Sequence, residues 1–136
     1  MSTWRRKAQE DYPSLSGDLE TWDRVAWNSK FSQILFNAVA SQDTQALDVA
    51  VRYLSWCWSQ RHADEQFIYF VDYTLRQLLE RPADRSEFAA FAGADSFRKV
   101  LAMYAEFNDK AQVVEFEREH RFRHRPNKSL ERTREG

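Results

Sequence analysis

Apolar residues return every three or four positions along much of the chain, most regularly in its middle. From Asp43 or Thr44 this spacing continues for about four turns and predicts an amphipathic helix. Its core face consists of Leu47, Ala50, Val51, Leu54, Cys57 and Trp58. A second apolar stripe, Val49, Tyr53 and Trp56, lies on another side of the same helix. We therefore expect this helix to be central in the fold or to lie at an interface.

The next amphipathic helix is predicted from Asp64 to about Glu80. Asp64 can cap its start, and the acidic Asp64 and Glu65 suit the positive end of the helix dipole. The expected core face is Phe67, Ile68, Val71, Leu75, Leu78 and Leu79. Tyr69 and Tyr73 project from a different side, as does Phe70. Either they form an exposed surface with Tyr53 and Trp56, or they pack on the terminal helices.

The remaining helices are shorter or less regular. Residues 3–11 read as a short helix or arm that ends before Pro13. Asp18 can cap a helix with two apolar stripes of different phase, which predicts a kink near Asn28 and Ser29. A short helix is expected to restart at Ser86 and close at Gly93. A further helix is expected at 95–107. Residues 110–120 fit either a helix or a short edge strand, and we expect a helix.

Composition agrees with a helical chain. Three glycines and three prolines in 136 residues supply few of the tight turns that β-rich domains require. The length suits one domain, and aromatic residues make up 15% of it. We expect an all-α fold, a small irregular bundle of five or six helices over residues 1–120, followed by a flexible basic tail over 121–136.

Charge is divided unevenly between these two parts. Residues 1–117 hold 13 Lys+Arg against 18 Asp+Glu, a net charge of −5, and residues 118–136 hold 7 against 3, a net charge of +4. The N-terminal stretch lacks the apolar core of a signal peptide, and no apolar run approaches a membrane span. These features predict a cytoplasmic protein with an acidic body.

The sequence shows no recognisable catalytic motif. Asp64 and Glu65 are explained by capping, and Asp72 by an ion pair with Arg76 at i+4. His120 and His124 have the spacing of two metal ligands on one helix face. The arginines around this pair oppose a bound cation, so we expect no metal, no cofactor and no enzyme activity. Cys57, between two tryptophans, is expected to be a packed thiol.

The C-terminal residues carry a resemblance to a known class of sequence. Residues 126–136, PNKSLERTREG, resemble the peptide that results when a reading frame runs through an integron cassette recombination site. The resemblance implies an integron gene-cassette product; such products include resistance, toxin–antitoxin and phage-defence proteins. Within the body, YFVDYTLRQLLE is similar in a generic way to small helical bacterial proteins of the immunity type.

These observations favour a non-catalytic binding protein, of the immunity or antitoxin kind, that engages a basic partner protein through an acidic body with exposed aromatic residues. The expected contact residues are Tyr53, Trp56, Asp64, Glu65, Tyr69 and Tyr73. A homodimer would also account for helices with two apolar faces.

Two alternatives remain open. One is a protein that binds or sequesters a small molecule in a pocket lined by Trp22, Trp27, Trp56 and Trp58. The other is a nucleic-acid-binding protein that uses the basic residues of 118–134. The acidic body would repel the same phosphates, which makes a nucleic-acid partner the less favoured of the two.

Overall fold

The computed structural model describes residues 2–121, and this part of the chain contains helices and no strand. The elements in chain order are α1 (Thr3–Asp11), the 3₁₀ turn η1 (Pro13–Leu15), α2 (Ser16–Thr21), α3 (Arg24–Ala40), α4 (Thr44–Ser59), α5 (Gln66–Leu79), α6 (Pro82–Phe91) and α7 (Ala94–Phe107). Residues 110–121 are also helical. The expected all-α fold is confirmed, but the expected count of five or six helices is too low.

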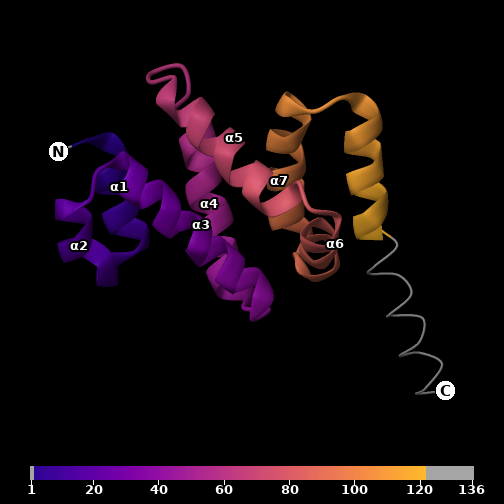
Figure 1. The fold of residues 1–136 in the computed structure, drawn as a ribbon, viewed down its shortest axis with the longest axis horizontal. Helices are drawn as coiled ribbons and strands as arrows, with labels where there is room; N and C mark the ends of the chain where they lie inside the picture. Colours follow the sequence, from indigo (N-terminus) through magenta and orange to yellow (C-terminus); the bar gives the residue numbers. More distant parts are fainter. Residues whose placement is uncertain (1, 122–136) are drawn as a thin grey trace.

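Helix α4 is the central element of the bundle. It contacts α1, α3, α5 and α7, and Figure 1 shows it behind the crossing of α3 and α5. The helices α1 and α2 lie at one end of the molecule, whereas α6, α7 and the helical segment 110–121 lie at the other (Figure 1). The apolar residues on two sides of α4 are explained by this position, as expected from their pattern.

The helix break in the N-terminal third lies earlier than predicted. Helix α2 ends at Thr21 and α3 begins at Arg24, so Asn28 and Ser29 are inside a continuous helix. Asp23 determines the start of α3, because its carboxylate accepts a hydrogen bond from the Ala26 N–H at 2.8 Å. Asp18, predicted as a cap, lies instead in the first turn of α2.

The start of α4 agrees with the sequence, and α5 begins two residues later than predicted, at Gln66 with Glu65 as its N-cap. Asp43 caps α4 by accepting a hydrogen bond from the Ala46 N–H at 3.1 Å. Asp64 accepts one from the Gln66 N–H at 3.0 Å, at the first residue of α5. Both carboxylates therefore satisfy backbone donors that a helix leaves unpaired at its N-terminus.

The starts of α6 and α7 differ from the expectation. Helix α6 begins at Pro82 and not at Ser86, because proline at the first helical position has the required φ and needs no hydrogen-bond partner for its nitrogen. Gly93 does not close α6; it is the N-cap of α7. The segment 110–121, ambiguous in sequence, is a helix, and Arg121, assigned to the tail, is its last described residue. The rest of the predicted tail lies outside the described residues.

The core contains two groups of aromatic side chains. The first, which we call the N-terminal aromatic cluster, consists of Tyr12, Trp27, Phe31, Tyr53 and Phe70. The second, the C-terminal aromatic cluster, consists of Phe88, Phe97, Tyr104, Phe116 and His120. Ring contacts in the N-terminal aromatic cluster are tilted or edge-on, whereas the C-terminal aromatic cluster combines stacked and tilted pairs.

Candidate functional site

The outer side of α5 carries the exposed aromatic residues of the described chain. Exposed large apolar side chains between residues 2 and 121 are Val25, Tyr69, Tyr73 and Val114, so the aromatic ones among them are both on α5. Tyr69 is 60% exposed and Tyr73 is 43% exposed. These two residues were predicted as contact residues, and the structure places both on the surface.

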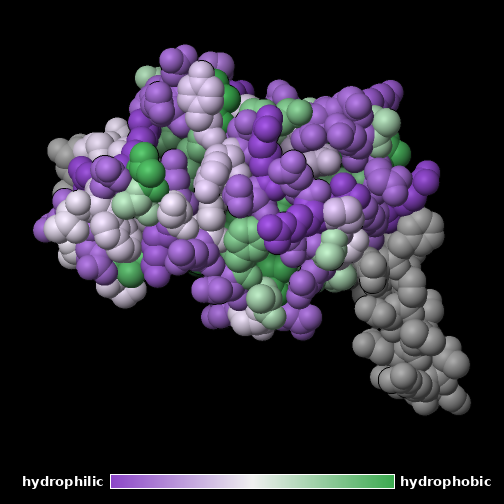
Figure 2. Space-filling view, in the orientation of Figure 1, coloured by the Kyte–Doolittle hydropathy of each residue, from purple (hydrophilic) through white to green (hydrophobic). Residues whose placement is uncertain are grey.

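Charged residues share this side of α5. With 3.6 residues per turn, six positions fall within an arc of about 100°. They are Glu65, Tyr69, Asp72, Tyr73, Arg76 and Glu80, which we call the α5 outer face. The Nε of Arg76 donates to Asp72 at 3.0 Å, so this arginine is already paired. Figure 2 shows pale and purple surface over α5, consistent with tyrosines among charged residues.

Tyr53, another predicted contact residue, is not on the surface. Its side chain is 0% exposed, and its hydroxyl accepts a hydrogen bond from Trp27 Nε1 at 2.9 Å. The same hydroxyl donates to the Trp4 carbonyl at 3.3 Å. Burial raises the pKa of Tyr53 well above its ordinary value. Tyr53, the middle residue of the second apolar stripe of α4, therefore packs against α1 and α3 within the chain and links the three helices.

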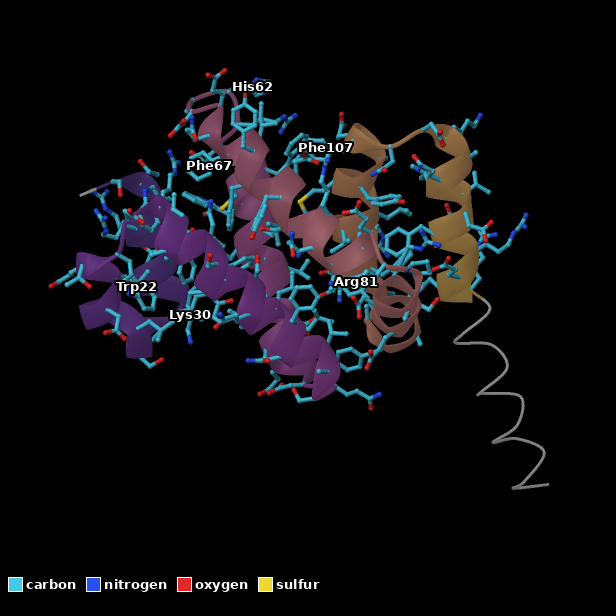
Figure 3. The ribbon with its side chains drawn as sticks, in the orientation of Figure 1. Trp22, Lys30, His62, Phe67, Arg81 and Phe107 are labelled. Carbon is cyan, nitrogen blue, oxygen red and sulfur yellow. The ribbon has the colours of Figure 1, made fainter. Side chains whose placement is uncertain are left out.

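The other predicted contact residues flank the start of α5. Glu65 is exposed and Asp64 is partly exposed. Asp64 forms an ion pair with Arg24 at 3.0 Å. The hydrogen bond from Gln66, followed by Arg24, lowers the pKa of Asp64. Trp56 is partly buried, in edge-on contact with Phe67, which Figure 3 labels. Glu65 therefore belongs to the α5 outer face, whereas Asp64 and Trp56 do not.

The four tryptophans of the predicted pocket do not line one common cavity. Trp27 is 1% exposed inside the N-terminal aromatic cluster. Trp58 is in edge-on contact with Phe107 at the far side of α4, and its ring is covered by Arg61. Trp22 lies beyond α3, near α1, where its carbonyl accepts a hydrogen bond from Arg5 (Figure 3). The Trp-lined pocket is therefore wrong in its geometry, because α3 and α4 direct these rings to different neighbours.

A cavity of about 240 Å³ lies elsewhere, between α5, α7 and the start of the helical segment 110–121. Leu75, Leu79, Tyr104 and Phe107 supply its apolar wall. Its charged lining comes from Asp72, Arg76, Glu80 and Arg85. Sequence reasoning missed this site, since its walls come from elements up to 40 residues apart. Asp72 is the one signal in the sequence, because in helical projection this carboxylate lies between the expected core residues Ile68 and Leu75.

The two histidines with the spacing of metal ligands, His120 and His124, do not form a metal site in the described structure. His120 Nδ1 lies 2.7 Å from the Ala89 carbonyl oxygen, and its ring stacks on Phe97 at 3.8 Å. His124 lies outside the described residues. Within residues 2–121 no three residues of the types His, Cys, Asp and Glu are placed to hold a metal ion together.

Cys57 is expected to resist alkylation in the folded protein. Its side chain is 0% exposed, and burial raises the pKa of the thiol well above its ordinary value. Because the thiolate is the reacting species, the native protein should not be labelled by iodoacetamide within minutes at pH 8. Mass spectrometry with and without 6 M urea checks this. Rapid labelling without urea would contradict the packing of α4.

Comparisons with known proteins identify no relative. No protein-family model matches the chain, and no curated protein and no solved structure shows significant similarity to it. Across the described part of the chain, no helix combines the length and the apolar character needed to span a membrane.

Proposed function

We propose that the protein is a non-catalytic binding protein, of the immunity or antitoxin kind, that engages a partner protein through the α5 outer face. The observation that carries this proposal is the pair Tyr69 and Tyr73, one turn apart and both exposed. Tyrosine is enriched in binding hot spots because it offers a large apolar area together with a hydroxyl.

The charge of the face determines the kind of partner. Arg76 is paired with Asp72, which leaves Glu65 and Glu80 at the two ends of the stripe as its unbalanced charges. The body as a whole is also acidic, at −5 over residues 1–117. A partner with a basic surface would be attracted by this field and would associate faster at low salt.

The experiment is a pull-down from bacterial lysate treated with nuclease, followed by reconstitution with the captured protein after purification. The full chain is compared with the double variant Tyr69→Ala/Tyr73→Ala. Its matched control is Val25→Ala/Val114→Ala, which removes the two other exposed apolar side chains. We expect the tyrosine variant to lose at least tenfold in affinity, while the valine variant binds normally.

Charge is tested with the same purified pair. The variant Glu65→Lys/Glu80→Lys should slow association and weaken its dependence on salt. Equal binding by the parent and the tyrosine variant would refute the α5 outer face as the contact surface. Self-association of the chain, measured by light scattering and lost in the tyrosine variant, would identify the partner as a second copy.

The origin as an integron cassette product stays a proposal that rests on residues 126–136 alone. It is compatible with a defence or immunity protein but does not select one. The nucleic-acid alternative depends mainly on residues outside the described part of the chain. It predicts binding that falls steeply with salt and disappears when the chain ends at Glu117.

A further inference from the structure

The α5 outer face has a nearly symmetric order of side chains along its helix. Tyr69 and Tyr73 lie two positions on either side of Val71. Glu65 is six positions before Val71, and Arg76 is five positions after it. At about 1.5 Å per residue, Glu65 is about 9 Å and Arg76 about 7.5 Å from the level of Val71 along the helix axis. An acidic and a basic side chain therefore flank the two tyrosines at nearly equal distances from one centre.

A face with this order is complementary to a second copy of itself when two α5 helices pack antiparallel. A two-fold axis at the level of Val71 brings Tyr69 of each copy opposite Tyr73 of the other. The same axis brings Glu65 of each copy opposite Arg76 of the other. At about 100° per residue, Glu65 and Arg76 lie toward the same edge of the face, so both ion pairs form in one arrangement. The two copies then share a central group of four tyrosines with an ion pair at each end.

The groups that make these contacts are accessible in the monomer. Tyr69, Tyr73 and Glu65 are exposed, and Figure 1 shows α5 on the near side of the molecule with α4 behind it. The Arg76 side chain is 68% exposed and donates to Asp72 through Nε. A guanidinium has further N–H donors on Nη1 and Nη2, which can bind a second carboxylate. The contact between copies therefore requires no bond of the monomer to break.

We propose that the α5 outer face binds a second copy of the chain in an antiparallel two-fold dimer. This inference rests on the proposed function only in using the same surface, and the dimer forms without the partner protein. Because Tyr69 and Tyr73 are covered in both complexes, self-association and partner binding exclude each other. A rising concentration of the chain therefore withdraws the contact surface from the partner.

The size of the contact makes this dimer weak. Helix α5 has 14 residues, a length of about 21 Å. One face of such a helix on another buries less than the roughly 1,200 Å² at which stable interfaces begin. The net charge of −5 over residues 1–117 also makes the two copies repel each other. We expect a dissociation constant on the order of 100 µM, so the chain is largely monomeric at the low micromolar concentrations used to measure partner binding.

Sedimentation equilibrium of the full chain between about 10 µM and 1 mM tests the dimer. The parent chain should be largely monomeric at the lower concentration and largely dimeric at the higher one. The variant Tyr69→Ala/Tyr73→Ala should dimerise at least tenfold more weakly, because it removes the central aromatic contact. The matched control Val25→Ala/Val114→Ala should dimerise like the parent chain.

Two charge variants test the two-fold geometry itself. In Glu65→Arg and in Arg76→Glu, both ion pairs become pairs of like charge, so each variant alone should dimerise at least tenfold more weakly. An equimolar mixture of the two should form a mixed dimer, because one variant then carries both positive groups and the other both negative groups. Glu106→Arg and Arg98→Glu make the same changes in charge at exposed positions of α7. Neither control should alter dimerisation.

Three results would overturn the dimer: a parent chain that is monomeric at about 1 mM, dimerisation that the tyrosine and charge variants leave unchanged, and no association in the mixture of the two charge variants. Circular dichroism of each variant establishes that the fold is retained. A monomeric parent chain refutes the dimer and leaves the partner contact standing. Equal partner binding by the parent chain and the tyrosine variant refutes the partner contact and leaves the dimer standing, so the two failures are told apart.

Discussion

Replacing Trp27 with alanine is expected to lower the free energy of unfolding by about 3–5 kcal/mol, the usual cost of removing a buried large aromatic side chain. Trp27 is 1% exposed and contacts Tyr12, Phe31 and Tyr53, with ring centroids 5.6–5.8 Å apart. Its indole N–H also donates to Tyr53. The substitution therefore leaves a cavity. It also removes the buried N–H group that donates a hydrogen bond to the Tyr53 hydroxyl.

Urea denaturation followed by circular dichroism at 222 nm measures this loss. Trp58→Ala is the matched control, because Trp58 is partly exposed and its main aromatic contact is with Phe107. We expect the control to lose less than half as much. A loss for Trp27→Ala that is no larger than that for Trp58→Ala would contradict the N-terminal aromatic cluster as the centre of the core.

The parts of the fold predicted correctly are those that depend on local chemistry. Asp43 is the N-cap of α4, as predicted, and Asp64 accepts a hydrogen bond from the first residue of α5 although Glu65 is the N-cap. The core face of α4 could be predicted for the same reason, because the spacing of its apolar residues depends on that helix alone. Leu47, Ala50 and Val51 from that face are each at most 1% exposed.

The errors in helix boundaries arose where two local signals compete. Both Asp18 and Asp23 can cap a helix, and the choice depends on how α1 and η1 pack against α2. Pro82 both ends α5 and begins α6, whereas the sequence was interpreted as if proline only ended a helix. The first case depends on tertiary contacts that no single segment contains, whereas the second follows from local proline chemistry that the sequence already held.

In the candidate sites, too, features set by a single helix could be predicted, whereas features set by tertiary contacts could not. The sequence placed Tyr69, Phe70 and Tyr73 off the predicted core face and left open whether they are exposed; Tyr69 and Tyr73 are, whereas Phe70 is buried. The burial of Tyr53 could not be predicted, because its hydroxyl donates a hydrogen bond to the carbonyl of Trp4, 49 residues earlier in the chain. The cavity beside Glu80 requires the relative positions of α5, α7 and the segment 110–121, and these are invisible in the sequence pattern.

The helical segment 110–121 determines whether the C-terminal aromatic cluster exists. Phe116 is 0% exposed and lies 4.8 Å from Phe97 and 4.9 Å from Tyr104, measured between ring centroids. The ion pair between Arg85 and Glu119 attaches the same segment to α6. Hydrogen bonding to Glu119 raises the pKa of Arg85, so the arginine stays charged.

Replacing Phe116 with alanine is expected to lower the free energy of unfolding by about 3–4 kcal/mol and to release this segment from the bundle. Val114→Ala is the control within the same helix, because Val114 is 46% exposed and its loss leaves no cavity. Hydrogen exchange should show faster exchange at residues 110–121 in the Phe116 variant than in the Val114 variant. Equal exchange and equal stability in the two variants would mean that Phe116 is not packed against α7.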